Sequence, residues 1–482
     1  MFSQYFQTLQ NCLKVKELQS RIFFTLMLLV VCRVVAMTPI PGLDGSALTA
    51  YFGLLNDHNE SGAPGGVGGL VSMYSMFTGG ALERCAVGSL GIMPYISATI
   101  IIQLMTAVVP SLSKLSREEG GRTQIIKYGR YLTVLLCLGQ GFVMSIGWEN
   151  PAQIGLGELG PKGDLAGWSW GDNQLVFDPG LWYRIRTMIL LTTGTVLLMW
   201  LGEQITERGI GNGISLVITV GIIARVDQAF FGIYNMFFPE NGEGAHPFNG
   251  VLLLALLLTV VGVVIAVTQA MRKIPVQYAQ RQVGRKMMQG GSTYFPLRVN
   301  YAGVMPIIFA QAILMFPAQI LGTIGRWLGE GNASEFFVGL GDALAYGSFW
   351  NLAMQSLMIL FFSYFWVATQ FNETQIADDL KKAGGYIPGV RPGNATRDFL
   401  HHAMSRLTLA GATFLVVIAV IPTVLGINLE IDFAVAQFFG GTSLLIMVGV
   451  MLDTMRQMES HLAQHHYDGF LKGGKKVRGR AG

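Results

Sequence analysis

Ten runs of mostly apolar residues, each long enough to cross a bilayer, divide this chain. A transmembrane α-helix needs about 20 consecutive apolar residues to span roughly 30 Å of hydrocarbon. Apolar residues make up 51% of the 482 residues and charged residues only 13%, whereas soluble proteins carry about 25% charged residues. We therefore predict an all-α polytopic membrane protein. The predicted spans cover residues 22 to 41, 85 to 109, 127 to 147, 183 to 202, 213 to 233, 250 to 271, 301 to 322, 351 to 371, 405 to 425 and 433 to 452.

The distribution of positive charge predicts the orientation of these spans. An even number of spans places both termini on one side, and short cytoplasmic loops of membrane proteins are enriched in Lys and Arg. Of the 33 Lys and Arg residues, 26 fall in the segments on the side of the two termini. We therefore expect a cytoplasmic N-terminal segment, residues 1 to 21, and a cytoplasmic tail, residues 453 to 482.

Two of the predicted spans have an unusual composition. The second span contains Ser97 and Gln103 among several small and polar residues, so it inserts poorly into lipid alone and is expected to face protein or a water-filled cavity. The seventh span contains Pro306 and Pro317, and proline inside a helix removes a backbone hydrogen bond and permits a kink. These two spans are our candidates for the moving parts of the molecule.

A Gly-rich stretch between the first and second spans, residues 65 to 80 (GGVGGLVSMYSMFTGG), is too short to cross a bilayer. It is compatible with a re-entrant or cavity-filling half-helix. It is equally compatible with an outside loop that contains one turn of helix. Composition alone leaves both interpretations open.

Several classes of chemistry lack a signature in this sequence. There is no GxxxxGK[ST], HExxH or GxSxG motif, and the four cysteines are too far apart for a metal or redox pair. We therefore expect neither an enzyme nor a cofactor. Ionisable residues within the spans are scarce, Arg33 being the clearest, and this disfavours an ion-coupled transporter.

The run RGIGNG, residues 208 to 213, predicts a tight turn between two spans.

Two basic loops on the predicted cytoplasmic side, residues 271 to 300 and 371 to 404, are long enough to carry a function. The second contains Arg391 within YIPGVRPGNAT, where two Pro-Gly pairs predict a projecting turn. A guanidinium at such a tip is suited to docking an acidic or phosphate-rich partner. The alternative is a solvated basic face that only fixes topology. The first loop carries Arg281, Arg285 and Lys286.

Nine specific motifs are spread along almost the whole chain. They are PIPGLD (39 to 44), GGAL (79 to 82), LGIMPYISATIIIQL (90 to 104), GRTQIIKYGRY (121 to 131), WLGEQITERGIGNGIS (200 to 215), YAQRQVGRK (278 to 286), VNYAGVMP (299 to 306), ADDLKKAGGYIPGVRPG (377 to 393) and GGTSLLI (440 to 446). Through these motifs the chain resembles the SecY family of protein-conducting channels. The ten spans and the cytoplasmic termini agree with the architecture of that family.

This resemblance implies two five-helix halves related as an inverted repeat, residues 22 to 233 and 250 to 452, joined by a hinge at about 234 to 249. Residues 65 to 77 are implied to be a plug helix that seals the outer funnel. Spans two, three, seven and eight are implied to form a lateral gate through which apolar segments leave into lipid.

The resemblance also implies two groups of site residues. Branched apolar side chains dewet a narrow throat and yield around a passing chain, and the implied pore ring consists of Ile92, Ile96, Ile218, Ile308 and Ile446. A polar cluster of the gate falls on Ser97, Gln140 and Asn300, assigned to spans two, three and seven. Ordinary interhelical hydrogen bonding is the alternative role for these three polar residues.

The function implied by the resemblance is translocation of unfolded secretory polypeptides across the bacterial plasma membrane. The implied partners are SecE-like and SecG-like membrane subunits, signal sequences and nascent polypeptide, and either a SecA motor ATPase or a ribosome docked on Arg391, Arg285, Lys286 and Arg281. Two alternatives are a secondary transporter of small solutes and an accessory member of the family that exports special substrates.

Overall fold

The structure is a computed structural model that describes most of the chain. It describes residues 15–49, 74–118 except 76, 120–149, 175–237, 247–278, 281–283, 286–288, 292–311, 313–314, 321, 325, 332–344, 348–428 and 442–472. The helices are α2 (Lys16–Met37), α5 (Met93–Val108), α6 (Pro110–Arg117), α7 (Gly121–Glu149), α8 (Leu181–Arg208), α9 (Gly213–Ile223), α10 (Val226–Phe237), α11 (Pro247–Gln269), α13 (Asn332–Ala343), α14 (Phe349–Gln370), α15 (Glu373–Lys382), α16 (Asn394–Asn428) and α18 (Thr442–Lys472). The strands are β1 (Met271–Tyr278), β2 (Arg281–Val283), β3 (Lys286–Met288), β4 (Ser292–Arg298) and β5 (Gly385–Tyr386).

The membrane-spanning character predicted from the apolar runs is confirmed. In the described residues, five helical segments are long and apolar enough to cross a membrane: α2, α7, α8, the segment Phe349–Lys382 that contains α14 and α15, and Asn394–Ile421 of α16. The bent pair α5 and α6 is a sixth when it is counted as one span. The described residues of the other predicted spans are mostly helical, but turns at 224–225 divide the fifth span into α9 and α10, and residues 301–304 precede the seventh helix. Polar residues extend α16 and α18 well beyond the predicted span ends.

The second predicted span differs from a single straight helix. Its helix begins at Met93, with Pro94 in the first turn, rather than at Cys85. The preceding residues form turns in which Gly91 has a φ of +57°, a conformation that favours glycine. At the other end, α5 and α6 meet at an angle of 103°, because Pro110 begins α6 and cannot donate the backbone hydrogen bond that would continue α5.

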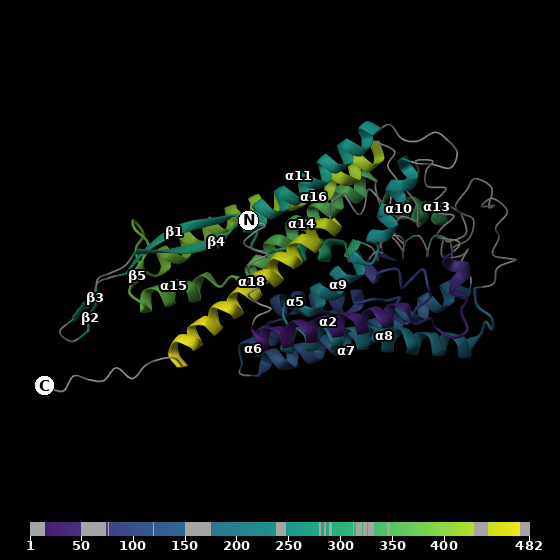
Figure 1. Cartoon of the computed structure of the whole chain (residues 1–482), viewed down its shortest axis with the longest axis horizontal. Helices are drawn as coiled ribbons and strands as arrows, with labels where there is room; N and C mark the ends of the chain where they lie inside the picture. Colours follow the sequence, from purple (N-terminus) through teal and green to yellow (C-terminus); the bar gives the residue numbers. More distant parts are fainter. Residues whose placement is uncertain are drawn as a thin grey trace.

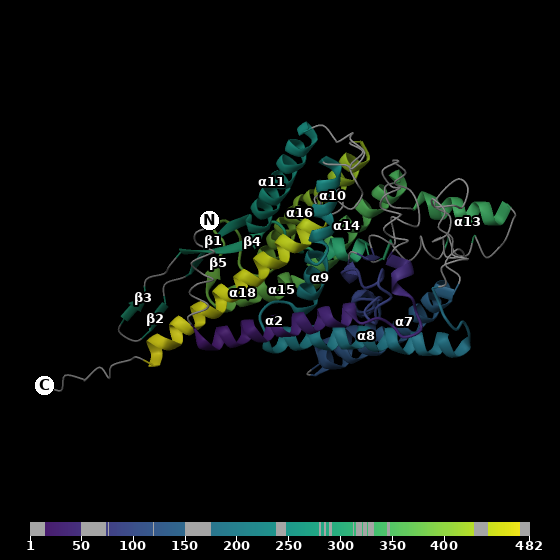
Figure 2. The same cartoon turned by 45° about the vertical axis from the view of Figure 1, so that its right-hand side comes forward.

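The helices pack in two groups that meet along α9 and α18. Helix α7 packs on α5 and α8, and α2 packs on α8 and α9. In the other group α14 packs on α16, and α11 packs on α18. Figures 1 and 2 show the first group on one side of the molecule and α11, α14 and α16 on the other, with α9 and α18 between them. The division into two five-helix halves with a hinge remains a prediction.

A small sheet, which the sequence analysis did not predict, stands at one end of the helix bundle (Figure 1). Strand β1 pairs antiparallel with both β4 and β5. One face of the sheet, with Ile274 and Leu297 buried, packs on residues of α14 and α16 such as Val367 and Leu400. The two basic loops of the sequence analysis are therefore joined into one folded unit.

The turn between α8 and α9 ties the start of the chain to its end. As predicted from RGIGNG, this turn is tight, with Gly211 at a φ of +91°. The backbone N–H of Ile210 donates to Thr25 Oγ1 (3.1 Å), and that of Gly211 donates to Gln457 Oε1 (2.9 Å). The start of α2 and the C-terminal part of α18 thus lie at the same end of the bundle, as an even number of spans requires.

Candidate functional site

Five isoleucines from four parts of the chain lie in one buried apolar cluster. Ile92 and Ile96 come from the start of α5 and Ile218 from α9, while Ile308 lies in the helical residues 305 to 311 and Ile446 on α18. None of the five is more than 5% exposed, and all belong to the same hydrophobic cluster. All five therefore lie in the apolar core to which both helix groups contribute. Their role as a pore ring remains a prediction.

The end of the predicted plug reaches the same cluster. Tyr74 and Phe77 are buried in it, and the Tyr74 hydroxyl donates to the carbonyl oxygen of Leu90 (2.9 Å). Residues 65 to 73 and 76 lie outside the described residues. The described end of the predicted plug thus belongs to the same buried apolar cluster as the isoleucines.

Residues 77 to 83 begin at the last residue of the predicted plug and contact α2 and α9 closely. Arg33 Nη1 donates to the carbonyl oxygen of Gly79 (2.6 Å). A Cβ on Gly79 would lie 3.0 Å from the Cα of Gly221, and a Cβ on Gly221 would lie 3.0 Å from the carbonyl oxygen of Phe77, so both positions require glycine for the backbones to approach. We call residues 77 to 83 the plug base.

One ion pair at the plug base was missed by the sequence analysis. Arg225 Nη2, from the residue pair between α9 and α10, lies 2.6 Å from Glu83 Oε1, and each side chain is 11% exposed. The sequence gives little indication of this pair, because Glu83 and Arg225 are 142 positions apart and belong to no common motif. The Ser75 hydroxyl donates to the same Oε1 atom (2.7 Å).

The three residues predicted for the polar cluster of the gate lie on different elements, and no hydrogen bond in the described structure joins Ser97 to Asn300. Ser97 on α5 and Asn300 are buried, and neither Ser97 Oγ nor Asn300 Nδ2 has a hydrogen-bond partner in the described structure. Gln140 is half-buried on α7, which packs against α5. Asn300 lies in the bend before the seventh helix rather than within it, and its Cα would be 3.5 Å from a Cβ on Gly411 of α16. The role of these residues as a gate remains a prediction.

The basic residues proposed for docking lie at the end of the bundle that carries the sheet. Arg391 is exposed in a turn that contains Gly389 and Gly393, with φ of +85° and +102°. Its carbonyl oxygen accepts from the Thr396 hydroxyl (3.0 Å), which fixes the turn on the start of α16. Arg281 and Lys286 lie on the hairpin of β2 and β3, whose backbone alone is described, and Arg285 lies outside the described residues.

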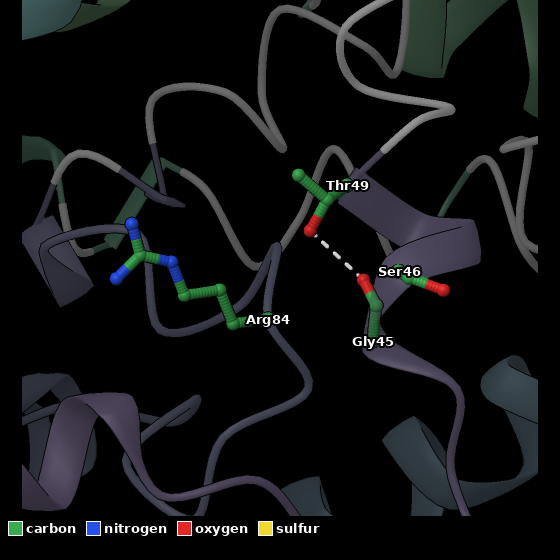
Figure 3. Close-up of a pocket in the computed structure, with 4 residues that line it drawn as sticks. All are labelled: Gly45, Ser46, Thr49 and Arg84. Atoms are coloured by element: carbon green, nitrogen blue, oxygen red, sulfur yellow. Dashed lines mark hydrogen bonds between the residues drawn. The ribbon is translucent and has the colours of Figure 1, made fainter.

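A shallow hollow opens on the surface near the plug base (Figure 3). It is lined by Gly45, Ser46, Thr49 and Arg84. Beside it, the hydroxyl and the backbone N–H of Ser46 donate to Asp44 Oδ1 (2.5 and 2.9 Å) and hold the pKa of Asp44 below its ordinary value. The described residues contain no group of His, Cys, Asp and Glu side chains that could hold a metal ion.

The membrane helices, the buried apolar core between the two helix groups and the basic folded end define an integral membrane protein. The sequence profile of the SecY family matches residues 86–455. The chain is 39% identical over 480 residues to the protein translocase subunit SecY of Chlamydia muridarum, covering 96% of this chain and 98% of the relative. It is 38% identical over 481 residues to the SecY subunit of Thermotoga maritima, covering 98% and 99%. The chain belongs to the SecY family, as its motifs predict.

Solved structures show the same fold. One, described as a protein-conducting channel, superposes with a TM-score of 0.54 at 17% identity, over 95% of this chain and 94% of that one. A Sec61 chain from the canine ribosome-channel complex of the endoplasmic reticulum superposes with a TM-score of 0.52 at 15% identity, over the same shares of the two chains. The architecture predicted from the resemblance is therefore confirmed at the level of the fold.

Proposed function

We propose that this chain forms a channel through which unfolded secretory polypeptides cross the membrane. The observation that carries this proposal is the convergence of Ile92, Ile96, Ile218, Ile308 and Ile446 in one buried cluster of a SecY-family protein. A ring of branched apolar side chains excludes water and ions from a narrow throat, yet it has no polar group that would bind a passing chain. Residues 65 to 77 act as the plug that closes this throat from the outer side.

Apolar segments leave the channel sideways through a gate between spans two and three on one side and spans seven and eight on the other. Ser97 Oγ and Asn300 Nδ2 have no hydrogen-bond partner among the described residues. This supports the role, because a buried polar group without a partner makes the closed packing less stable. A hydrophobic signal sequence can then compete for the interface. Gln140 supplies the third polar side chain, and the segment 234 to 249 acts as the hinge between the two halves.

The protein lies in the bacterial plasma membrane with the sheet, the start of α2 and the C-terminal part of α18 on the cytoplasmic side. The concentration of Lys and Arg in the segments at this end supports the orientation. SecE-like and SecG-like subunits complete the complex in the lipid bilayer. A SecA motor ATPase or a translating ribosome docks on Arg391, Arg281, Arg285 and Lys286 and supplies the energy, so the channel itself hydrolyses no ATP.

Reconstitution tests this function. The chain is purified with its small membrane subunits and placed in vesicles, and a secretory polypeptide is added with SecA and ATP. We expect the polypeptide to become protected from external protease only when the motor, ATP and this chain are all present. Protection that does not depend on this chain would contradict the proposal.

A further inference from the structure

The plug base is held on the wall of the channel by contacts from two different helices. Arg33 of α2 binds the Gly79 carbonyl (2.6 Å), and Gly221 of α9 lets the backbone of Phe77 and Gly79 approach closely. Both contacts involve the backbone of the plug base. Neither contact fixes a side chain of the plug itself.

Ser75 provides a side-chain contact at the end of the plug. It is fully buried. Its carbonyl oxygen accepts from the backbone N–H of Gly80 (2.9 Å), which closes a turn, and its hydroxyl donates to Glu83 Oε1 (2.7 Å). The chain therefore leaves the base at Ser75, and the Glu83 carboxylate determines the position of that residue.

Glu83 is in turn held by Arg225. The two side chains are 2.6 Å apart and each is only 11% exposed, so the attraction is weakly screened by solvent. A buried carboxylate without its partner is strongly unfavourable. One oxygen atom, Glu83 Oε1, accepts from both Ser75 and Arg225, so the ion pair and the plug contact share an acceptor.

The position of Arg225 connects this contact to the rest of the channel. It lies between α9, which contributes Ile218 to the isoleucine cluster, and α10, which leads to the proposed hinge segment 234 to 249. A rearrangement at the end of α9 would therefore move Arg225 and with it the acceptor that holds Ser75.

We infer that Glu83 and Arg225 form a latch that positions the end of the plug, through Ser75, in the closed channel. Glu83 and Arg225 are positioning residues, since neither lies in the throat itself. The inference rests on the proposed function as a channel and adds to it a control of the closed state. Weakening the latch increases the fraction of time in which the plug leaves the throat.

The test is the ion conductance of the resting channel in planar bilayers, without motor or substrate. Ser75→Ala removes only the hydroxyl, a small change that leaves the ion pair intact, and we expect it to raise the conductance about tenfold, as loss of a hydrogen bond to a charged group predicts. Glu83→Ala should raise it at least as much. The exchange of both charges, Glu83→Arg with Arg225→Glu, should return the conductance toward that of the original protein relative to Glu83→Arg alone.

The matched control is a second short ion pair on the same protein. Arg184 and Glu149 join α8 to the end of α7 at 2.6 Å, and no hydrogen bond in the described structure links either of them to the plug base. Glu149→Ala should reduce thermal stability without raising the resting conductance. A purely structural role for Glu83 predicts the same behaviour for both glutamates.

Two results would separate the failure of the latch from that of the proposed function. If the original protein translocates a secretory chain but Ser75→Ala and Glu83→Ala both keep its low resting conductance, the latch is wrong and the channel stands. If the original protein translocates nothing in the complete system, the channel proposal fails, and the latch fails with it.

Discussion

The guanidinium of Arg33 donates a 2.6 Å hydrogen bond to the backbone carbonyl oxygen of Gly79. Arg33, the clearest ionisable residue within a predicted span, therefore contacts the plug base. A charged donor to a buried carbonyl contributes about 1.5 to 3 kcal/mol. We expect Arg33→Leu to lower the free energy of unfolding in detergent by about that amount and to raise the resting conductance.

Arg21→Leu is the control for this substitution on the same helix. Arg21 is 37% exposed and lies 3.4 Å from Glu17, and exposed pairs of this kind contribute about 0 to 1 kcal/mol. Equal effects of the two substitutions would show that the Arg33 contact has no special role.

Gly221→Ala tests the close approach of α9 to the plug base. The added Cβ would lie 3.0 Å from the carbonyl oxygen of Phe77, and a backbone atom cannot move aside as a flexible side chain can. We expect a higher resting conductance. We also expect the free energy of unfolding to fall by about 1 to 3 kcal/mol, the usual cost of overpacking. Gly262→Ala on α11, where a Cβ meets nothing within 4 Å, should leave the conductance unchanged.

Widening the throat should let ions pass. Ile308 is 1% exposed in the isoleucine cluster, and Ile308→Ala removes branched apolar volume that keeps the throat dry. We expect resting conductance to rise and the protein to lose about 2 to 5 kcal/mol of stability. Ile274→Ala, at an equally buried site in the sheet, should cost similar stability without a leak. A leak from the Ile274 variant as large as that from the Ile308 variant would remove Ile308 from the ring.

Reversing the charge of Arg391 should weaken docking of the motor. Its side chain is exposed in a turn held by two glycines with positive φ, so Arg391→Glu changes the surface without disturbing the core. We expect slower SecA-driven translocation and normal insertion of the protein into the membrane. Arg21→Glu, a charge reversal on the predicted cytoplasmic side, should leave the translocation rate within about twofold of the original, because most exposed surface substitutions have small effects. Normal translocation by the Arg391 variant would exclude it from the docking surface.

Much of the fold follows from hydropathy, because a helix is the simplest way to satisfy every backbone polar group in lipid. The sheet does not follow from it. Strands β1 and β4 each contain a proline, Pro275 and Pro296, and proline in a short segment argues against a strand. Only pairing between segments about twenty residues apart, with Ile274 and Leu297 buried against α14 and α16, makes these residues a sheet.

The site was predictable to a smaller degree. Family motifs selected the five isoleucines, since an isoleucine in a membrane helix is otherwise a packing residue. The pair Glu83 and Arg225 joins positions 142 residues apart, and neither periodicity nor a motif indicates such a contact. The partner of Arg33 is a backbone carbonyl, which has no signature in the sequence at all.

The path of the polypeptide is tested most directly by a disulfide cross-link at the throat. In a variant without the four native cysteines, Ile308→Cys is combined with an arrested secretory chain that carries one cysteine. Ile205→Cys, buried on α8 outside the isoleucine cluster, is the control. We predict a cross-link at position 308 that requires the arrested chain, and none at 205. An arrested chain that engages the complex but forms no cross-link at 308, or forms one equally at 205, would contradict passage through the isoleucine ring.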